Sequence, residues 1–112
     1  MSVDVMEPGS LVVVNCLNPP EKMWGKMVRL DALGIVLRGL NLHSLEDWLT
    51  QEKTGEDAFI APSTVFIPMH RIERIYIDET TRVAKSFGDR FADACGVDVR
   101  VALDGRCDDE AH

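Results

Sequence analysis

The chain has little of what marks several large classes of protein. No apolar run approaches the roughly 20 residues that a membrane-spanning helix needs, so we expect no membrane span. The first seven residues are acidic and lack the basic segment of a signal peptide, which makes a cytoplasmic location the expectation. Cysteine is scarce, and no C-x-x-C pair is present. We therefore expect Cys16 and Cys95, which fall in predicted elements, to be small core side chains, with Cys107 near the end of the chain.

Motifs for catalysis and cofactor binding are also missing. The sequence contains no nucleophile elbow, phosphate-binding loop, dinucleotide fingerprint or pair of catalytic carboxylates. His43, His70 and Cys16 have spacings that match no compact zinc site. We therefore expect a protein that is not an enzyme and that holds neither a metal nor a cofactor.

Positive charge is in short supply. Twelve Lys and Arg stand against 19 Asp and Glu, which gives a formal net charge of −7. Residues 1–8 carry −2, residues 9–78 carry −2 and residues 79–112 carry −3. A negative surface repels nucleic acid, because contacts to phosphate supply most of that affinity. The central segment is close to balance, so the charge counts against RNA binding without excluding it.

What the sequence does contain is a series of short apolar runs between residues 11 and 78. They predict strands, because each run is rich in β-branched or alternating apolar residues and is bounded by turn residues. Gly25 and Gly39 lie inside two of these runs and favour a bent barrel over a flat sheet. The predicted strands cover residues 11–17, 22–30, 35–42 and two segments of 64–77 that meet at a sharp turn at 68–70.

Two helices are predicted between and after these strands. The first begins at Ser44 as N-cap and ends at Gly55, and Trp48 on its apolar face is expected to pin it over one end of the barrel. The second follows Ser86, carries a stripe with Phe87 and Phe91, and ends at Gly96. The next segment, 97–103, alternates like a strand, yet Asp98 could cap a helix, and both interpretations stay open. The predicted layout is a tail (1–8), a barrel (9–78), a helical extension (79–103) and an acidic tail (104–112).

The run from Met23 to Leu37 resembles the first motif of the Sm-like family. Gly25 and Asp31 fall on matching positions, while Gly34 stands where that family often has an RNA-contacting Asn. The run from Val65 to Ile75 resembles the closing strand pair of Hfq, the bacterial branch of the family, with His70 near its His. The Arg-Gly pair of the other branches is absent.

The resemblance implies a mainly β fold. The expected architecture is a small five-stranded, bent barrel of the Sm-like or SH3-like kind, with a short helix between strands three and four and a C-terminal helical extension. It also implies assembly into a homo-oligomer, in which strands four and five of neighbouring copies pair. An exposed edge in a small sheet needs such a partner or a cover.

Two polar or aromatic features carry alternative interpretations. His70 and Arg71, beside Glu73 and Arg74, form either an anion or nucleotide site or, as we favour, a solvated turn. Trp24 is either a core residue or an exposed anchor for a partner.

Two functions therefore compete, and we favour the first. One is a homo-oligomeric interaction module, in which the Phe87/Phe91 helix docks on a neighbour or on a partner protein. The other is RNA binding on an Sm-like ring surface, and a ligand-sensing barrel is a weaker third option. The expected oligomer interface consists of Val65, Phe66, Ile67, Ile75, Tyr76 and Ile77, and the expected RNA or anion site of Lys26, Arg29, Arg38, His70 and Arg71.

Overall fold

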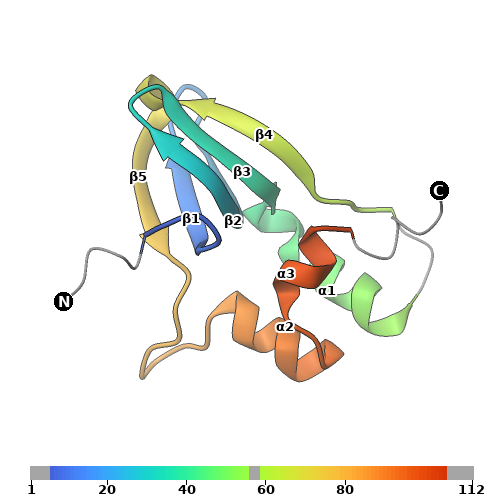
Figure 1. The fold of residues 1–112 in the computed structure, drawn as a ribbon. Helices are drawn as coiled ribbons and strands as arrows, with labels where there is room; N and C mark the ends of the chain where they lie inside the picture. The colour runs from blue at the N-terminus through green and yellow to red at the C-terminus, as the bar shows by residue number, and fades with distance from the viewer. Residues whose placement is uncertain (1–5, 56–58, 106–112) are drawn as a thin grey trace.

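The computed structural model describes residues 6–55 and 59–105, and it shows an antiparallel five-stranded sheet with helices packed against one side (Figure 1). The strands lie in the order β4-β3-β2-β1-β5. They are β1 (Leu11–Cys16), β2 (Glu21–Asp31), β3 (Gly34–Asn41), β4 (Ser63–Pro68) and β5 (Ile72–Ile77). The helices are α1 (Leu45–Thr54), α2 (Phe87–Cys95) and α3 (Val99–Leu103), with short 3-10 turns η2 (Leu42–Ser44) and η3 (Met69–Arg71).

The prediction of a mainly β fold with five strands and an inserted helix is confirmed. The sheet is open in the described residues, because β4 and β5 lie at its two edges and each pairs with only one neighbour. The segment 97–103, which left strand and helix undecided, contains helix α3. Its N-cap is Asp98, whose carboxylate accepts a hydrogen bond from the Arg100 amide.

Only one of the two serines predicted as N-caps makes a side-chain cap hydrogen bond. Ser86 caps α2 as expected, accepting a hydrogen bond from the Asp89 amide, and Gly96 ends that helix in the left-handed conformation. Ser44 occupies the N-cap position of α1 as predicted, but its side chain makes no cap hydrogen bond, because η2 runs through it into α1. Gly55 ends α1 as predicted, with φ 74°.

The sheet bends where two glycines face each other. Gly25 on β2 pairs with Gly39 on β3, and these strands approach so closely that a Cβ would meet backbone. A Cβ on Gly39 would lie 1.9 Å from the Trp24 carbonyl oxygen, and one on Gly25 would lie 2.3 Å from the Arg38 carbonyl oxygen. The two positions therefore tolerate no side chain, as expected for bend points.

The outer face of the sheet carries an aromatic core under the helices. Trp24 from β2 lies 5.0 Å from Phe87 and 6.3 Å from Trp48, and Trp48 lies 5.2 Å from Phe91, measured between ring centroids. All four rings are buried. Trp48 thus holds α1 on the sheet as predicted, and Trp24 is a core residue rather than an exposed anchor. The Phe87/Phe91 stripe needs a correction, since it packs inside this chain and offers no exposed ring to a partner.

The inner face carries a second, aliphatic core. Its buried members come from the bent sheet itself and include Cys16, which is 3% exposed. Cys95 is partly buried against the outer core, so both described cysteines pack as small core side chains, and both are free thiols. Cys107 lies outside the described residues. The larger members of the inner core are Val12, Val14, Met23, Met27, Ile35, Leu37 and Ile67.

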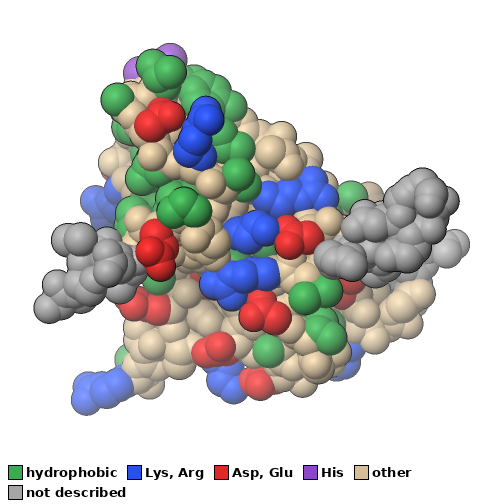
Figure 2. Space-filling model, viewed as in Figure 1, with side chains coloured by type: hydrophobic (Ala, Val, Ile, Leu, Met, Phe, Trp, Pro, Cys, Tyr) green, Lys and Arg blue, Asp and Glu red, His purple; other side chains and the backbone are tan. Residues whose placement is uncertain are grey.

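The two ends of the sheet differ in what covers them. We call the end with the β2–β3 turn and η3 the tip, and the opposite end, against the helices, the helical end. At the tip the Met69 amide donates a hydrogen bond to the Leu33 carbonyl (2.8 Å), and Leu33 is 74% exposed. Hydrophobic side chains gather there, whereas acidic and basic side chains mix across the junction with the helices (Figure 2). No helix within residues 6–55 and 59–105 is long and apolar enough to cross a membrane.

Candidate functional site

The two edges of the sheet are the first candidate site. β4 pairs only with β3, and β5 pairs only with β1, so each presents an outer row of backbone groups without a strand partner among the described residues. β4 runs from the helical end to the tip, and after η3 the chain returns along β5 to the helical end (Figure 1). Both edges therefore lack a second strand partner among the described residues, and they run in opposite senses.

The residues predicted for the oligomer interface divide between the faces of the sheet. Val65, Ile67, Ile75 and Ile77 point to the inner face and pack with the aliphatic core. On the outer face, Phe66 of β4 is 53% exposed and Tyr76 of β5 is 40% exposed. The structure thus places apolar side chains on matching faces of both edges.

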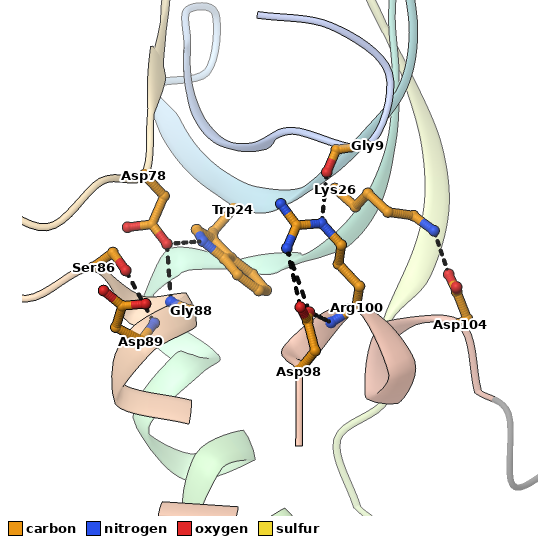
Figure 3. Close-up of polar contacts among 10 residues, drawn as sticks. All are labelled: Gly9, Trp24, Lys26, Asp78, Ser86, Gly88, Asp89, Asp98, Arg100 and Asp104. Carbon is orange, nitrogen blue, oxygen red and sulfur yellow. Dashed lines mark hydrogen bonds and ion pairs between the residues drawn. The ribbon is translucent and has the colours of Figure 1, made fainter. Parts of the chain in front are cut away.

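The residues predicted for RNA binding do not form one surface. Lys26 pairs with Asp104 (Figure 3). The Arg38 Nε donates a hydrogen bond to the Leu103 carbonyl (2.6 Å), so both side chains fasten α3 to the outer face. Arg71 fastens the turn after β1, donating to the carbonyls of Leu17 (2.9 Å) and Pro19 (2.8 Å). These three predicted residues are therefore engaged with distant parts of the chain.

The remaining two lie near the tip. Arg29 at the end of β2 is exposed and lies 3.4 Å from the Asp31 carboxylate, and His70 is exposed within η3. Of the polar cluster at 70–74, Arg71 is engaged with the neighbouring turn. Arg74 lies over the Tyr76 ring, 5.9 Å from its centroid. The structure thus brings together no continuous basic patch from the five predicted residues.

A crevice of about 460 Å³ at the helical end is the second candidate site. It opens where β5 ends, between the sheet and helices α2 and α3. Leu11 and Val99 are buried at its base, with Ile77 and Ala92 beside them. Polar side chains form the rest of the lining: Ser10, Asp78, Glu79, Thr80, Ser86, Asp89, Asp98 and Arg100.

Asp78 is the central polar residue of this crevice. Its Oδ2 accepts hydrogen bonds from the Trp24 indole Nε1 (3.1 Å) and the Gly88 amide (3.1 Å), and its Oδ1 accepts one from the Phe87 amide (3.1 Å) (Figure 3). These amides are orphan donors of the first turn of α2, where a carboxylate is favoured by the helix dipole. Asp78 therefore joins β5, β2 and α2 at one point, and its oxygens are already occupied.

Three other charged groups of the lining, Asp89, Asp98 and Arg100, also make contacts within the chain. Asp89 accepts a hydrogen bond from the Thr80 hydroxyl, and the Arg100 Nε donates to the Gly9 carbonyl (2.7 Å) while its Nη1 faces Asp98 (3.4 Å). Among residues 6–55 and 59–105 no group of three or more His, Cys, Asp or Glu side chains is placed to hold a metal ion. The crevice is therefore a shaped recess with an acidic rim, in which four carboxylates stand against Arg100, and its accessible apolar surface comes from Ile77 and Ala92.

Contacts and burial elsewhere in the molecule shift the pKa values of several groups. A hydrogen bond from Arg90 on α2 lowers the pKa of Glu46 on α1 (Nη2–Oε1 2.7 Å), and the pKa of Arg90 is raised by the same contact. Burial raises the pKa of the Cys16 and Cys95 thiols, which keeps both in the unreactive protonated form. The pKa shifts of Glu46 and Arg90 thus reflect a structural ion pair, and those of the two thiols show that neither cysteine is activated as a nucleophile.

Sequence reasoning missed Asp78 and the whole crevice. The only local signal was an acid directly after the last predicted strand and before a Ser86 cap, which says nothing about the long-range contact with Trp24. No family of known proteins, no curated protein and no solved structure matches this chain. The functional argument therefore depends on the geometry alone.

Proposed function

We propose that this protein is a non-enzymatic module that assembles with copies of itself by pairing β4 of one copy with β5 of the next. The observation that carries this proposal is the match between the two edges. Each is a six-residue strand with a free outer row of backbone groups, and each carries apolar side chains on both faces. In this proposal the sheet belongs to the small Sm-like or SH3-like barrels, in which such edges meet between copies.

The side chains favour this pairing for a physical reason. Continuing the sheet from β4 to a second copy's β5 puts inner-face Val65 and Ile67 beside inner-face Ile75 and Ile77. It also brings Phe66, on the outer face of β4, to the β5 edge of the second copy, which carries Tyr76 on its outer face. Aromatic and aliphatic cross-strand pairs stabilise a sheet by roughly 0.2–1 kcal/mol each. An edge left open would instead be a template for uncontrolled association.

The contact is head-to-tail, because one copy contributes β4 and the other β5. A head-to-tail contact that repeats with a fixed rotation closes into a ring, and one that does not close gives a filament. A defined, closed assembly is the expected form.

The test is the mass of the purified protein by light scattering across a dilution series. We expect a defined multiple of the 12.5 kDa chain mass. Val65→Lys puts an inward-pointing charge on the β4 edge, a device that prevents strands from pairing, and should return the protein to a monomer. Val83→Lys adds the same charge at a position that is 90% exposed in a loop, and it should leave the assembly intact. A mass of 12.5 kDa at every concentration contradicts the proposal.

Salt separates this proposal from RNA binding. Copies with a net charge of −7 repel each other, so screening by salt should strengthen their association. RNA affinity instead falls steeply as salt rises. An assembly that dissociates in high salt, together with nucleic acid absorbance in the low-salt preparation, would favour an RNA-dependent complex instead.

A further inference from the structure

Phe59 is an exposed aromatic residue on a fixed backbone. Its side chain is 90% exposed, yet its amide donates a hydrogen bond to the Oε1 of Gln51 (2.8 Å). Gln51 is 9% exposed, and it also holds the next residue, accepting from the Ile60 amide (3.0 Å) and donating to the Ile60 carbonyl (2.8 Å). The buried side-chain amide of Gln51 thus bonds to backbone groups as a neighbouring strand would, and it fixes the segment that carries the Phe59 ring.

An aromatic side chain presented this way has the features of an interface anchor. An exposed phenyl ring does not contribute the free energy of burial that such a ring usually gives a fold. Because its backbone is already ordered, less conformational entropy is lost when the ring binds a partner. Anchors of this kind dominate the binding free energy of protein interfaces. Phe59 therefore indicates a partner with a recess for one ring.

The position of Phe59 identifies that partner. It lies four residues before β4 begins, so it continues the β4 edge at the helical end. The crevice lies at the same end of the sheet, next to the β5 edge. Ile77 is the last residue of β5, and residues 78–80, which follow it, line the crevice. If a second copy in the same orientation pairs its β5 with this β4, the strands run antiparallel (Figure 1). The segment before β4 then lies beside the residues that follow the second copy's β5.

The crevice suits a phenyl ring in size and lining. Its volume of about 460 Å³ exceeds that of one phenylalanine side chain, and its base is apolar, with Leu11, Val99 and Ala92. The Arg100 guanidinium, fixed at the rim by Gly9, can lie over an inserted ring as a cation–π partner. Leu11 and Val99 are already buried, so the apolar surface that an occupant would cover is that of Ile77 and Ala92.

We propose that Phe59 of each copy inserts into the crevice of the next copy, where it covers Ile77 and Ala92. This inference rests on the proposed self-association and adds a second, specific contact to it. The edge strands supply the backbone pairing, and the ring in the crevice fixes the register and the direction of the assembly.

A photo-crosslinking experiment tests the contact directly. The full chain carrying p-benzoylphenylalanine at position 59 is mixed with an isotope-labelled unmodified chain, irradiated and digested for mass spectrometry. We expect crosslinks between copies to peptides that contain residues 77–80, Ala92 or Val99. Crosslinks within the same chain, or to other surfaces of an intact assembly, overturn the inference.

Matched variants keep this result distinct from the test of the proposed function. Phe59→Ala should weaken self-association at least tenfold, and Val83→Ala, at an equally exposed position, should leave it unchanged. Ala92→Phe places a larger side chain in the lining of the crevice, where it takes up the space proposed for Phe59. It should therefore weaken association as Phe59→Ala does. If Val65→Lys dissociates the assembly while Phe59→Ala and Ala92→Phe do not, the insertion is wrong and the edge pairing stands. If the unmodified protein is a monomer, both proposals fail.

Discussion

Within the described residues, the two faces of this sheet are covered by other parts of the chain, whereas its two edges are not. The outer face is covered by helices that are tied down at specific points: Asp78 holds α2, Arg38 and Lys26 hold α3, and Gln51 holds the segment before β4. The inner face is closed by the bend of the sheet itself. The edges alone keep a free row of backbone groups in the described residues. We therefore attribute stability to the faces and the proposed association to the edges, and the two should respond to different substitutions.

The bend of the sheet should give the largest effect on stability. Gly39→Ala places a Cβ 1.9 Å from the Trp24 carbonyl oxygen, so the two strands must separate and both cores must repack. We expect a loss of about 3 kcal/mol in the free energy of unfolding, the upper range for overpacking a core. Denaturant unfolding measures it. Gly55→Ala, at a cap with open space around it, serves as the control and should lose less; equal losses at the two sites would argue against the close approach.

The Asp78 junction should give the next largest effect. Asp78→Ala leaves the buried Trp24 indole and two helix amides without their acceptor, and we expect a loss of about 2 kcal/mol in the free energy of unfolding. Trp24 fluorescence should change with the loss. Asp78→Asn keeps one acceptor oxygen and should lose less than the alanine variant. A variant as stable as the unmodified protein would show that the junction contributes nothing to holding α2.

The smallest effect should come from the ion pair between α1 and α2. Arg90 lowers the pKa of Glu46 below its ordinary 4.5, so the folded state binds that proton less readily than the unfolded state. The stabilisation is then complete above pH 4.5 and is lost as the pH falls through the lowered folded value. Because both side chains are largely exposed, Glu46→Gln should remove only about 0.3–0.5 kcal/mol at pH 7.

The control for that variant lies one residue along the same helical turn. Asp47→Asn removes an acid from the first turn of α1 that forms no ion pair among the described residues. Thermal unfolding at pH 7 and at pH 3 compares the two variants. The difference between Glu46→Gln and the unmodified protein should be smaller at pH 3 than at pH 7; a difference that does not shrink would contradict the ion pair as its cause.

The sequence predicted the local elements better than the contacts between them. Alternation and turn residues located the five strands, and the glycine bends followed from Gly25 and Gly39. The segment 97–103 stayed undecided because apolar residues two apart fit a strand, whereas Val99 and Leu103, four apart, fit a buried helix face equally well. Only the outer core, where both are buried, decides for the helix.

The sites escaped sequence reasoning for a related reason. Lys26 and Arg38 look like a basic surface in the sequence, but their partners, Asp104 and the Leu103 carbonyl, lie some 65 to 78 residues further along the chain. The same holds for Trp24 and Asp78, which are 54 residues apart. Phe59 is an ordinary apolar residue in the sequence, and its exposure becomes informative only when Gln51 is seen to fix its backbone.

The central claim is that the edges of this sheet assemble copies of the chain, and one measurement tests it most directly. Light scattering on the unmodified protein and on Val65→Lys, side by side over the same concentrations, reports the mass of each. The account predicts a defined multiple of 12.5 kDa for the unmodified protein and 12.5 kDa for a folded Val65→Lys. A single mass of 12.5 kDa for both proteins at every concentration would contradict it.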